Sequence, residues 1–470
     1  MGFVRPLLIT SLLKAALVIE KYAHFNYKED FQMTFPEQVK AFLWGDIHKM
    51  SQDPGRFAKN PFADFTRTRK LDFENLLRFL ISMHSDNTAT ELLKYFNYDI
   101  DTLSNSAFYQ QRNKLLPCAF PFLLRQFNSR FDFHLYRGVY NLVSCDGSGL
   151  NIARNPNDPD TFHPPSGSSS IGFNMLHLVA LYDLLSKRYL DCVIQKGRLK
   201  NEFQALCDLI DAYSYSGIPI FIADRGFASY NVFAHAYEND RLFLIRTKDI
   251  NARRFLNLES LPNLIDTTVE LILSRSQSAK KRLRPDLAER YRYVSSEVSF
   301  DFIVKGSAEE YPLSLRVVRF EVADGSFENI ITNLHGDEFS AIDIKLLYHL
   351  RWGIETSFRD LKHTIGTINF HSKKAEYIEQ EIWARLILFN FCAIVTAHVV
   401  ITQKNTKYAY QVNFAMAMKI SHCFIRLKEG DPTLQVERLI GSFTLPIRPG
   451  RNYARRHRPQ SPASFCYRFS

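Results

Sequence analysis

Two apolar runs in the middle of the chain each end at an aspartate that is followed directly by a glycine-containing turn. YNLVSC precedes Asp146 in CDGSG, and IPIFIA precedes Asp224 in ADRGF. A short apolar run bounded by turn residues is typical of a buried strand. Sheets of α/β proteins place reactive groups at the carboxyl ends of such strands. The two acids are therefore candidate site residues, although a single strand-end aspartate more often only caps the next turn.

The segments around these acids alternate between strand and helix patterns. NMLHLVALYDL and RYLDCVIQKG read as strands after the first run, and RLFLIRTKD reads as a strand after the second. Helix patterns at NEFQALCDLIDAYSYSG and SYNVFAHAYEND flank the second run. The order strand, strand, strand, helix, strand, helix, strand predicts an α/β sheet covered by helices.

The length of 470 residues is too great for one small core, and the pattern of the sequence changes several times along it. We expect five regions: a helical N-terminal DNA-binding region at 1–135, the first part of an α/β core at 136–250, a β-rich insertion at 251–338, a helical second part of the core at 339–430, and a basic tail at 431–470. The basic loop that begins at Ser274 is either a solvated linker or a phosphate-contacting arm.

The stretch YHLRWGIETSFRDLK, residues 348–362, predicts a helix with an unusual polar ridge. At about 100° per residue, its four functional side chains lie within about 60° of arc. These are Tyr348, Arg351, Glu355 and Lys362. A stripe of apolar residues lies beside them and would pack on the sheet. A plain Arg351–Glu355 pair on a surface helix would explain two of the four residues, but not the other two.

Three carboxylates at one point repel one another unless a cation neutralises them. The three acids are Asp146, Asp224 and Glu355. Hard oxygen ligands favour Mg²⁺, with Mn²⁺ as a substitute, and two such ions form the clamp used in phosphoryl transfer. Arg351 and Lys362 would then hold neighbouring phosphates. Tyr348 would donate to a phosphate oxygen or stack on a base.

The formal net charge of +10 favours a polyanionic partner, nucleic acid before an anionic membrane. Two predicted helices, NTATELLKYF and SNSAFYQQRNKLL, are joined by a turn and suggest a helix-turn-helix that reads DNA with Gln111 and Arg112. The alternative is an ordinary αα-hairpin with a solvated polar face.

The cysteines and the longest apolar segments argue against a secreted or membrane protein. Seven scattered cysteines without a CxxC pair fit neither a disulfide framework nor a zinc ribbon, and are typical of a reducing cytoplasm. The apolar segment from Pro6 is interrupted by a lysine, and the one from Leu386 is shorter than the ~20 residues of a membrane span. We interpret the first as a terminal helix and the second as a buried core helix.

The spacing Y-x2-R-x3-E-x6-K resembles the YREK signature of the IS-four group of bacterial insertion-sequence transposases. CDGSG and IADRGF resemble the two catalytic-aspartate motifs of that group, and the resemblance covers roughly residues 70–460. It implies an RNase H-like catalytic core interrupted by a β-strand insertion. It also implies a DDE triad of Asp146, Asp224 and Glu355 that binds two Mg²⁺ ions. Tyr348, Arg351 and Lys362 would be the contacts to phosphates of the end DNA.

The activity implied by the resemblance is that of a DNA transposase. Such an enzyme cuts double-stranded DNA at the terminal inverted repeats of its element and joins the ends to target DNA, as a homodimer on synapsed ends. We expect it in the cytoplasm, on the nucleoid and not at a membrane, with Arg225 as a further DNA contact. Phe327 and Trp352 are candidates for the aromatic that some relatives use to hold a flipped base. The segment before Met33 has no match to the group.

Two other functions compete with this prediction. One is a transposase-derived DNA-binding protein without catalysis, which would retain the fold but not the cutting activity. The other is a stand-alone RNase H-like nuclease that hydrolyses DNA without joining it. The complete set of acids and the ridge on 348–362 favour the transposase.

Overall fold

The computed structural model describes residues 33–67, 69–166, 171–277, 285–323, 325–366, 370–403 and 407–448. The chain forms two compact units. Of the described residues, the first unit combines 33–116 with 387–448, and the second comprises 117–386. This division differs from the five expected regions in two respects. The boundary lies at Leu116 instead of near 135, and the helices after Ile387 group with the N-terminal ones.

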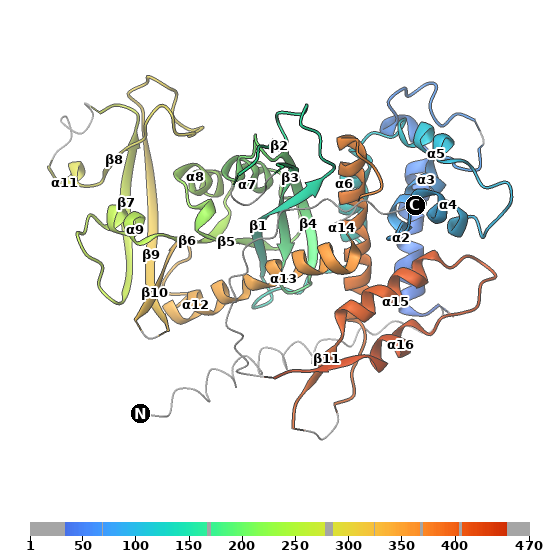
Figure 1. Cartoon of the computed structure of the whole chain (residues 1–470). Helices are drawn as coiled ribbons and strands as arrows, with labels where there is room; N and C mark the ends of the chain where they lie inside the picture. The colour runs from blue at the N-terminus through green and yellow to red at the C-terminus, as the bar shows by residue number, and fades with distance from the viewer. Residues whose placement is uncertain are drawn as a thin grey trace. The chain divides into compact units, whose positions relative to one another are not determined.

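In the described part of the second unit, ten strands form one sheet (Figure 1). Its first strands are β1 (Tyr140–Ile152), β2 (Phe162–His163), β3 (Phe173–Asp183), β4 (Arg188–Lys196), β5 (Ile218–Ala223) and β6 (Leu242–Thr247). β3 pairs antiparallel with β1, β2 and β4, whereas β5 runs parallel to both β1 and β6. The predicted α/β sheet is confirmed. The order of its strands and helices along the chain is also as predicted, apart from the additional short strand β2.

The strands expected in a β-rich insertion extend this same sheet. They are β7 (Ile265–Ser274), β8 (Tyr291–Tyr293), β9 (Glu310–Ala323) and β10 (Ser326–Thr332). β10 pairs antiparallel with β6, and the order continues through β9 and β7 to β8. Val317 and Val318 point to opposite faces of β9, and both are fully buried, so both faces are covered there. The strand content was therefore predicted, but not its continuity with the core sheet.

Helices cover the two faces of the core strands. Helices α7 (Glu202–Asp211) and α8 (Tyr230–Glu238) pack on the face that carries Val143, Cys145 and Phe221. The opposite face carries the alternate residues, including Ser144 and its partner Tyr182. Helix α13 (Trp352–Asp360) approaches this second face, where a side chain added at Gly353 would come within 2.9 Å of Leu184 Cδ2. Helices α6 (Ala119–Asn128), α9 (Asp249–Leu256) and α11 (Pro285–Ala288) also belong to this unit.

The predicted late helix is built from three consecutive pieces. Helix α12 (Ala341–Leu350) starts at a capping box of Ser340 and Asp343. Helix α13 follows across Arg351, which keeps helical angles of φ −50° and ψ −31°. A π turn, η3 (Leu361–Ile365), then continues to Gly366, whose φ of +92° ends the helix. Figure 1 shows α12 and α13 one after the other across the strands. The α-helical spacing of about 100° per residue therefore applies from α12 into α13. It does not apply in the π turn that carries Lys362.

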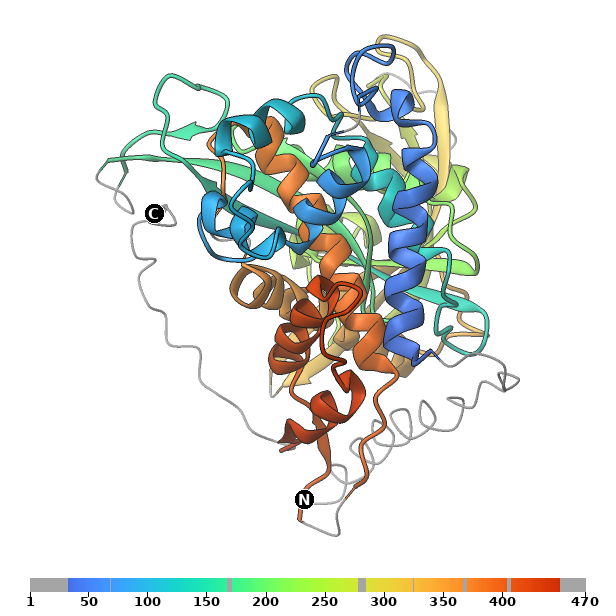
Figure 2. The same ribbon diagram turned by 90° about the vertical axis from the view of Figure 1, so that its right-hand side faces the viewer.

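The described part of the first unit is helical, apart from a two-stranded sheet (Figure 2). Its elements are α2 (Phe35–Ser51), η1 (Pro54–Phe57), α3 (Phe73–Ser82), α4 (Thr88–Tyr95), α5 (Asn105–Arg112), β11 (Tyr410–Val412), α15 (Phe414–Arg426), α16 (Val436–Ser442) and β12 (Thr444–Pro446). Helix α15 is joined to the N-terminal helices because His422 Nε2 lies 2.9 Å from the Ser82 carbonyl and Arg426 pairs with Glu91 at 3.3 Å.

The structure differs in part from the predictions for the basic tail and for the apolar segment from Leu386. Residues 431–448 were expected in an irregular tail, but they contain α16 and β12, which pairs antiparallel with β11. The rest of the basic tail lies outside the described residues. The apolar segment from Leu386 falls in α14 (Ala375–Ala397), which is long and apolar enough to cross a membrane by length and composition alone. Within its most apolar window, 89% is buried inside the protein.

The two helices α4 and α5 have the predicted caps, and the predicted turn NYDIDTL lies in the connection between them. Asn87 accepts the Thr90 N–H at 2.9 Å, and Ser104 accepts the Ala107 N–H at 3.3 Å. The connection between the helices runs from Phe96 to Ser104, longer than the ~3–4-residue turn of a helix-turn-helix. Arg112 is 0% exposed. The prediction that Arg112 reads DNA is therefore wrong for this arrangement, because its guanidinium is packed inside the unit.

Two described arginines of the basic loop that begins at Ser274 donate to backbone carbonyls of the same unit. Arg275 donates to the carbonyls of Ile303, Ser295 and Phe300 at 2.8–3.1 Å. Arg292, at the far end of the loop, donates to the carbonyl of Arg254. These two cations hold the loop in place. The lysines and arginines at 280–284 lie outside the described residues.

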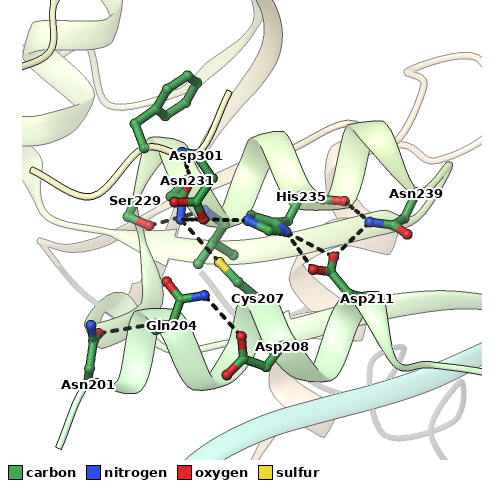
Figure 3. Close-up of polar contacts among 12 residues, drawn as sticks. Asn201, Gln204, Cys207, Asp208, Asp211, Ser229, Asn231, His235, Asn239 and Asp301 are labelled. Carbon is green, nitrogen blue, oxygen red and sulfur yellow. Dashed lines mark hydrogen bonds and ion pairs between the residues drawn. The ribbon is translucent and has the colours of Figure 1, made fainter. Parts of the chain in front are cut away.

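A polar cluster centred on His235 joins α7, α8 and the segment before β9 (Figure 3). His235 Nδ1 lies 2.9 Å from Asp211 Oδ1, and His235 Nε2 lies 2.9 Å from Asp301 Oδ2. Asn231 donates to Asp301 at 2.9 Å, and Asn239 donates to Asp211 at 2.8 Å. Burial disfavours the imidazolium, but the hydrogen bonds to the two carboxylates outweigh it and raise the pKa of His235. The protonated ring, which donates from both nitrogens, is thus the form that fits this cluster.

We expect His235→Gln to remove a pH-dependent part of the stability. Because the folded-state pKa of His235 is raised, its stabilisation is complete below the unfolded pKa of about 6.5 and is lost as the pH rises through the folded value. The loss should be only roughly 1 kcal/mol, because solvent screens the exposed carboxylates of Asp211 and Asp301. Urea unfolding between pH 6 and pH 9 measures it. The exposed His335→Gln is the control, and equal pH slopes for wild type and His235→Gln would contradict the prediction.

Candidate active site

The strand register places Asp146 and Asp224 side by side. Parallel pairing of β1 with β5 ends where Cys145 faces Ala223, so the next residue on each strand is the aspartate. Strand β5 ends there, as predicted for Asp224. Strand β1 does not end at Asp146 but continues to Ile152 through its antiparallel pairing with β3. The prediction of a strand end was therefore wrong for Asp146, because β3 supplies hydrogen-bond partners beyond the end of β5.

Helices α12 and α13 bring three of the predicted polar side chains to these aspartates. Tyr348 Oη donates to Asp224 Oδ1 at 3.0 Å. Arg351 Nη2 donates to Glu355 Oε1 at 2.9 Å, and Arg351 Nη1 lies 4.0 Å from Asp146 Oδ2. Tyr348 and Arg351 are only 5% and 4% exposed. Arg351 thus lies between two of the acids and joins the helix to the strand.

Buried contacts fix α13 against the sheet next to this site. Tyr189 on β4 and Ser357 on α13 share a hydrogen bond of 2.8 Å between their hydroxyls. Both residues are buried, and the Ser357 hydroxyl also donates to the Ile354 carbonyl at 2.8 Å. Together with the close approach of Gly353 to Leu184, this contact sets the position of Glu355 on the helix.

The two aspartates titrate differently because their surroundings differ. Burial raises the pKa of Asp146 to about 6, against the lowering effects of the Gly147 N–H and of Arg351. For Asp224, burial also acts to raise the pKa, but the Arg225 N–H, the Tyr348 hydroxyl and nearby arginines outweigh it and lower the pKa. Glu355 adds to the negative charge around Asp146. The acids therefore form one electrostatically connected group.

Arg246 belongs to this group, although it was not predicted from the sequence. The β5–β6 register pairs Ala223 with Ile245, so Arg246 is the residue next to Asp224 on the neighbouring strand. Its Nη1 lies 3.6 Å from Asp224 Oδ1, and its Nη2 lies 3.3 Å from Glu328 Oε1. Alignment of the two apolar runs IPIFIA and LFLI at their ends would have found it.

The other predicted DNA contacts in this unit differ in their exposure and in their neighbours. Lys362 is half-buried in the π turn, burial lowers its pKa, and it has no ion pair with any acid that the structure describes. Arg225 is exposed directly after Asp224. Trp352 is 45% exposed, with the Arg351 guanidinium 5.3 Å from its ring centre. Phe327 is half-buried, with the Arg319 guanidinium 4.8 Å from its ring centre.

The donor set fits a divalent cation in its chemistry, since it offers only carboxylate oxygens. The distances between the three acids do not form a metal site in this arrangement. Among the described residues, no three His, Cys, Asp or Glu side chains are close enough together to hold a metal ion. Arg351 supplies the positive charge between Asp146 and Glu355 in this arrangement. Binding of a metal by all three acids would therefore require Arg351 to give up at least one of its contacts.

Comparison with known proteins assigns the family. The model of the transposase DDE domain matches residues 137–391, which is more than half of the chain. The chain belongs to the transposase DDE domain family. The matched range contains both aspartates, Glu355 and the whole of α12 and α13. No curated protein sequence matches the chain.

Among solved structures, the piggyBac transposase synaptic complex with hairpin DNA is similar to this DDE-domain chain at a TM-score of 0.40 and 12% identity. The alignment covers 87% of this chain and 85% of that one.

Proposed function

We propose that this chain is a transposase of the IS-four group that cuts the ends of an insertion sequence and joins them to target DNA. The observation that carries the proposal is the convergence of Asp146, Asp224 and Glu355 around Arg351 and Tyr348, within the range that matches the transposase DDE domain. The spacing of Tyr348, Arg351, Glu355 and Lys362 supports the narrower assignment to the group with the YREK signature.

The strand order supports an RNase H-like core. Three antiparallel strands, β4, β3 and β1, are followed by the parallel strands β5 and β6. Asp146 lies on the central strand and Asp224 at the end of the next one. Glu355 approaches from the helix that packs over them. This arrangement gathers acids from three separate parts of the chain at one place over the central strands, as a two-metal phosphoryl-transfer site requires.

In this proposal, Asp146, Asp224 and Glu355 hold two Mg²⁺ ions, which supply charge stabilisation for the attacking and leaving oxygens of the phosphodiester. The residues of the chain position the DNA. Lys362 and Arg225 are available for phosphates because neither has an acidic partner among the described side chains. The Arg225 N–H and the Tyr348 hydroxyl lower the pKa of Asp224, and Arg351 and Arg246 add to this effect. Tyr348 also holds the carboxylate in place through the 3.0 Å hydrogen bond.

A joining assay tests this function. Purified protein with Mg²⁺, a duplex carrying the ends of its own element and a supercoiled target plasmid should give covalent joints between end and target. Cleavage without joints would indicate the stand-alone nuclease, and binding without cleavage would indicate the inactive DNA-binding protein. A homodimer on synapsed ends predicts that joints contain two ends per target molecule. The transposase proposal also predicts short inverted repeats and direct target duplications on either side of the gene.

A further inference from the structure

A cavity of about 420 Å³ in the first unit has a basic lining. It lies between the chain that precedes α3 and the C-terminal end of α5, and its cations are Arg67, Arg69 and Lys114. Arg67 and Arg69 are exposed, and neither forms an ion pair with an acid in the described part of the chain. Cations of a folded surface that lack acidic partners and face one cavity attract an anion to it.

Gln111 adds an unpaired polar group to the same cavity. It is 8% exposed, it lines the cavity, and its side-chain amide has no hydrogen-bond partner among the residues that the structure describes. Because Gln111 lines the cavity, its amide is available to a ligand there. The amide can donate two hydrogen bonds to a ligand oxygen.

The remaining polar lining does not cancel the positive charge. Among the described lining residues, Asp72 is the one acid against three cations, and its carboxylate accepts the Asn75 N–H at the start of α3 at 2.8 Å. Phe65 has φ of +59°, a left-handed conformation that is uncommon for a bulky side chain and costs local strain. Its ring lies 5.9 Å from the Lys114 ammonium. The left-handed turn at Phe65 thus places its ring in the lining of the cavity, next to Lys114.

We propose that this basic cavity binds backbone phosphates of duplex DNA. Arg67 and Arg69 have the forked geometry that suits phosphate oxygens, Lys114 supplies a point charge, and Gln111 supplies amide donors. The inference rests on the proposed transposase function, and it assigns a DNA-contacting surface to the first unit. Of the two predicted DNA contacts on α5, Gln111 is kept in this proposal. The buried Arg112 is left out, and Arg67 and Arg69 before α3 take its place.

Fluorescence anisotropy with a labelled duplex tests the basic cavity. Loss of one phosphate contact should lower the salt slope of log K by about 0.9, which corresponds to about eightfold weaker binding at 0.1 M salt. Arg67→Ala and Arg69→Ala should each show this change, and the double variant should bind about 60-fold more weakly. The losses should be equal on an element-end duplex and on a scrambled duplex, because phosphate contacts carry no sequence information.

Lys70→Ala is the matched control. Lys70 follows Arg69 in the sequence but already pairs with Asp99 at 3.1 Å and donates to the Asp101 carbonyl at 3.0 Å. Its removal should change affinity by less than twofold. If Arg67→Ala and Arg69→Ala also bind within twofold of wild type with an unchanged salt slope, the inference is wrong. If the wild type binds DNA through the cavity but does not cut it, the proposed transposase activity is wrong and the DNA-binding cavity stands.

Discussion

Asp146→Asn and Glu355→Gln should each lower the rate of DNA cleavage by about 10³-fold or more without unfolding the protein. Each change removes one negative charge from the group of acids and keeps the size of the side chain. The amide oxygen that Asp146→Asn introduces can still accept the Gly147 N–H, which lies 2.8 Å from Asp146 Oδ1 in the wild type. Cleavage of labelled element ends gives the rate, and circular dichroism with thermal unfolding checks the fold.

Asp208→Asn is the control for these two variants. Asp208 lies on α7, on the other face of the sheet, and accepts a hydrogen bond from Gln204 at 3.0 Å. The control variant should cleave at the wild-type rate. Wild-type cleavage by Asp146→Asn or by Glu355→Gln would remove that acid from the proposed triad. A variant that loses both cleavage and its thermal transition would point to a role in folding instead.

Arg351→Gln should lower the free energy of unfolding by roughly 2–3 kcal/mol in metal-free buffer. Removal of the guanidinium leaves Asp146, Asp224 and Glu355 facing one another without their central cation. The expected loss is smaller than for a fully buried pair, because these carboxylates keep 23%, 34% and 35% of their side-chain exposure. Chemical denaturation in EDTA measures this difference.

Added Mg²⁺ should then raise the melting temperature of Arg351→Gln more than that of the wild type. A divalent cation replaces the missing positive charge in the variant, whereas in the wild type it competes with Arg351 for the same oxygens. Arg351→Lys, which keeps the charge but loses the fork, should lie between the two. Equal Mg²⁺ shifts for wild type and Arg351→Gln would mean that Arg351 and the metal do not share the carboxylates.

The local patterns of the sequence predicted the elements of the core well. The apolar runs before Asp146 and Asp224 are buried strands, and the caps at Asn87 and Ser104 are present. The ridge on 348–362 faces the two aspartates through Tyr348 and Arg351. These predictions succeeded because strand burial, helix caps and helical periodicity depend on residues within a few positions of one another.

The sequence by itself determined the alternation of strands and helices, the polar ridge, and the three acids as candidates. Only the tertiary structure decided which groups meet. It placed Arg246 beside Asp224, set Arg351 between Asp146 and Glu355, and buried Arg112. It also joined the expected insertion to the core sheet through β10 and β6. Periodicity reports which face of an element is buried but not what buries it, because strand pairing and side-chain packing depend on residues far apart in the chain.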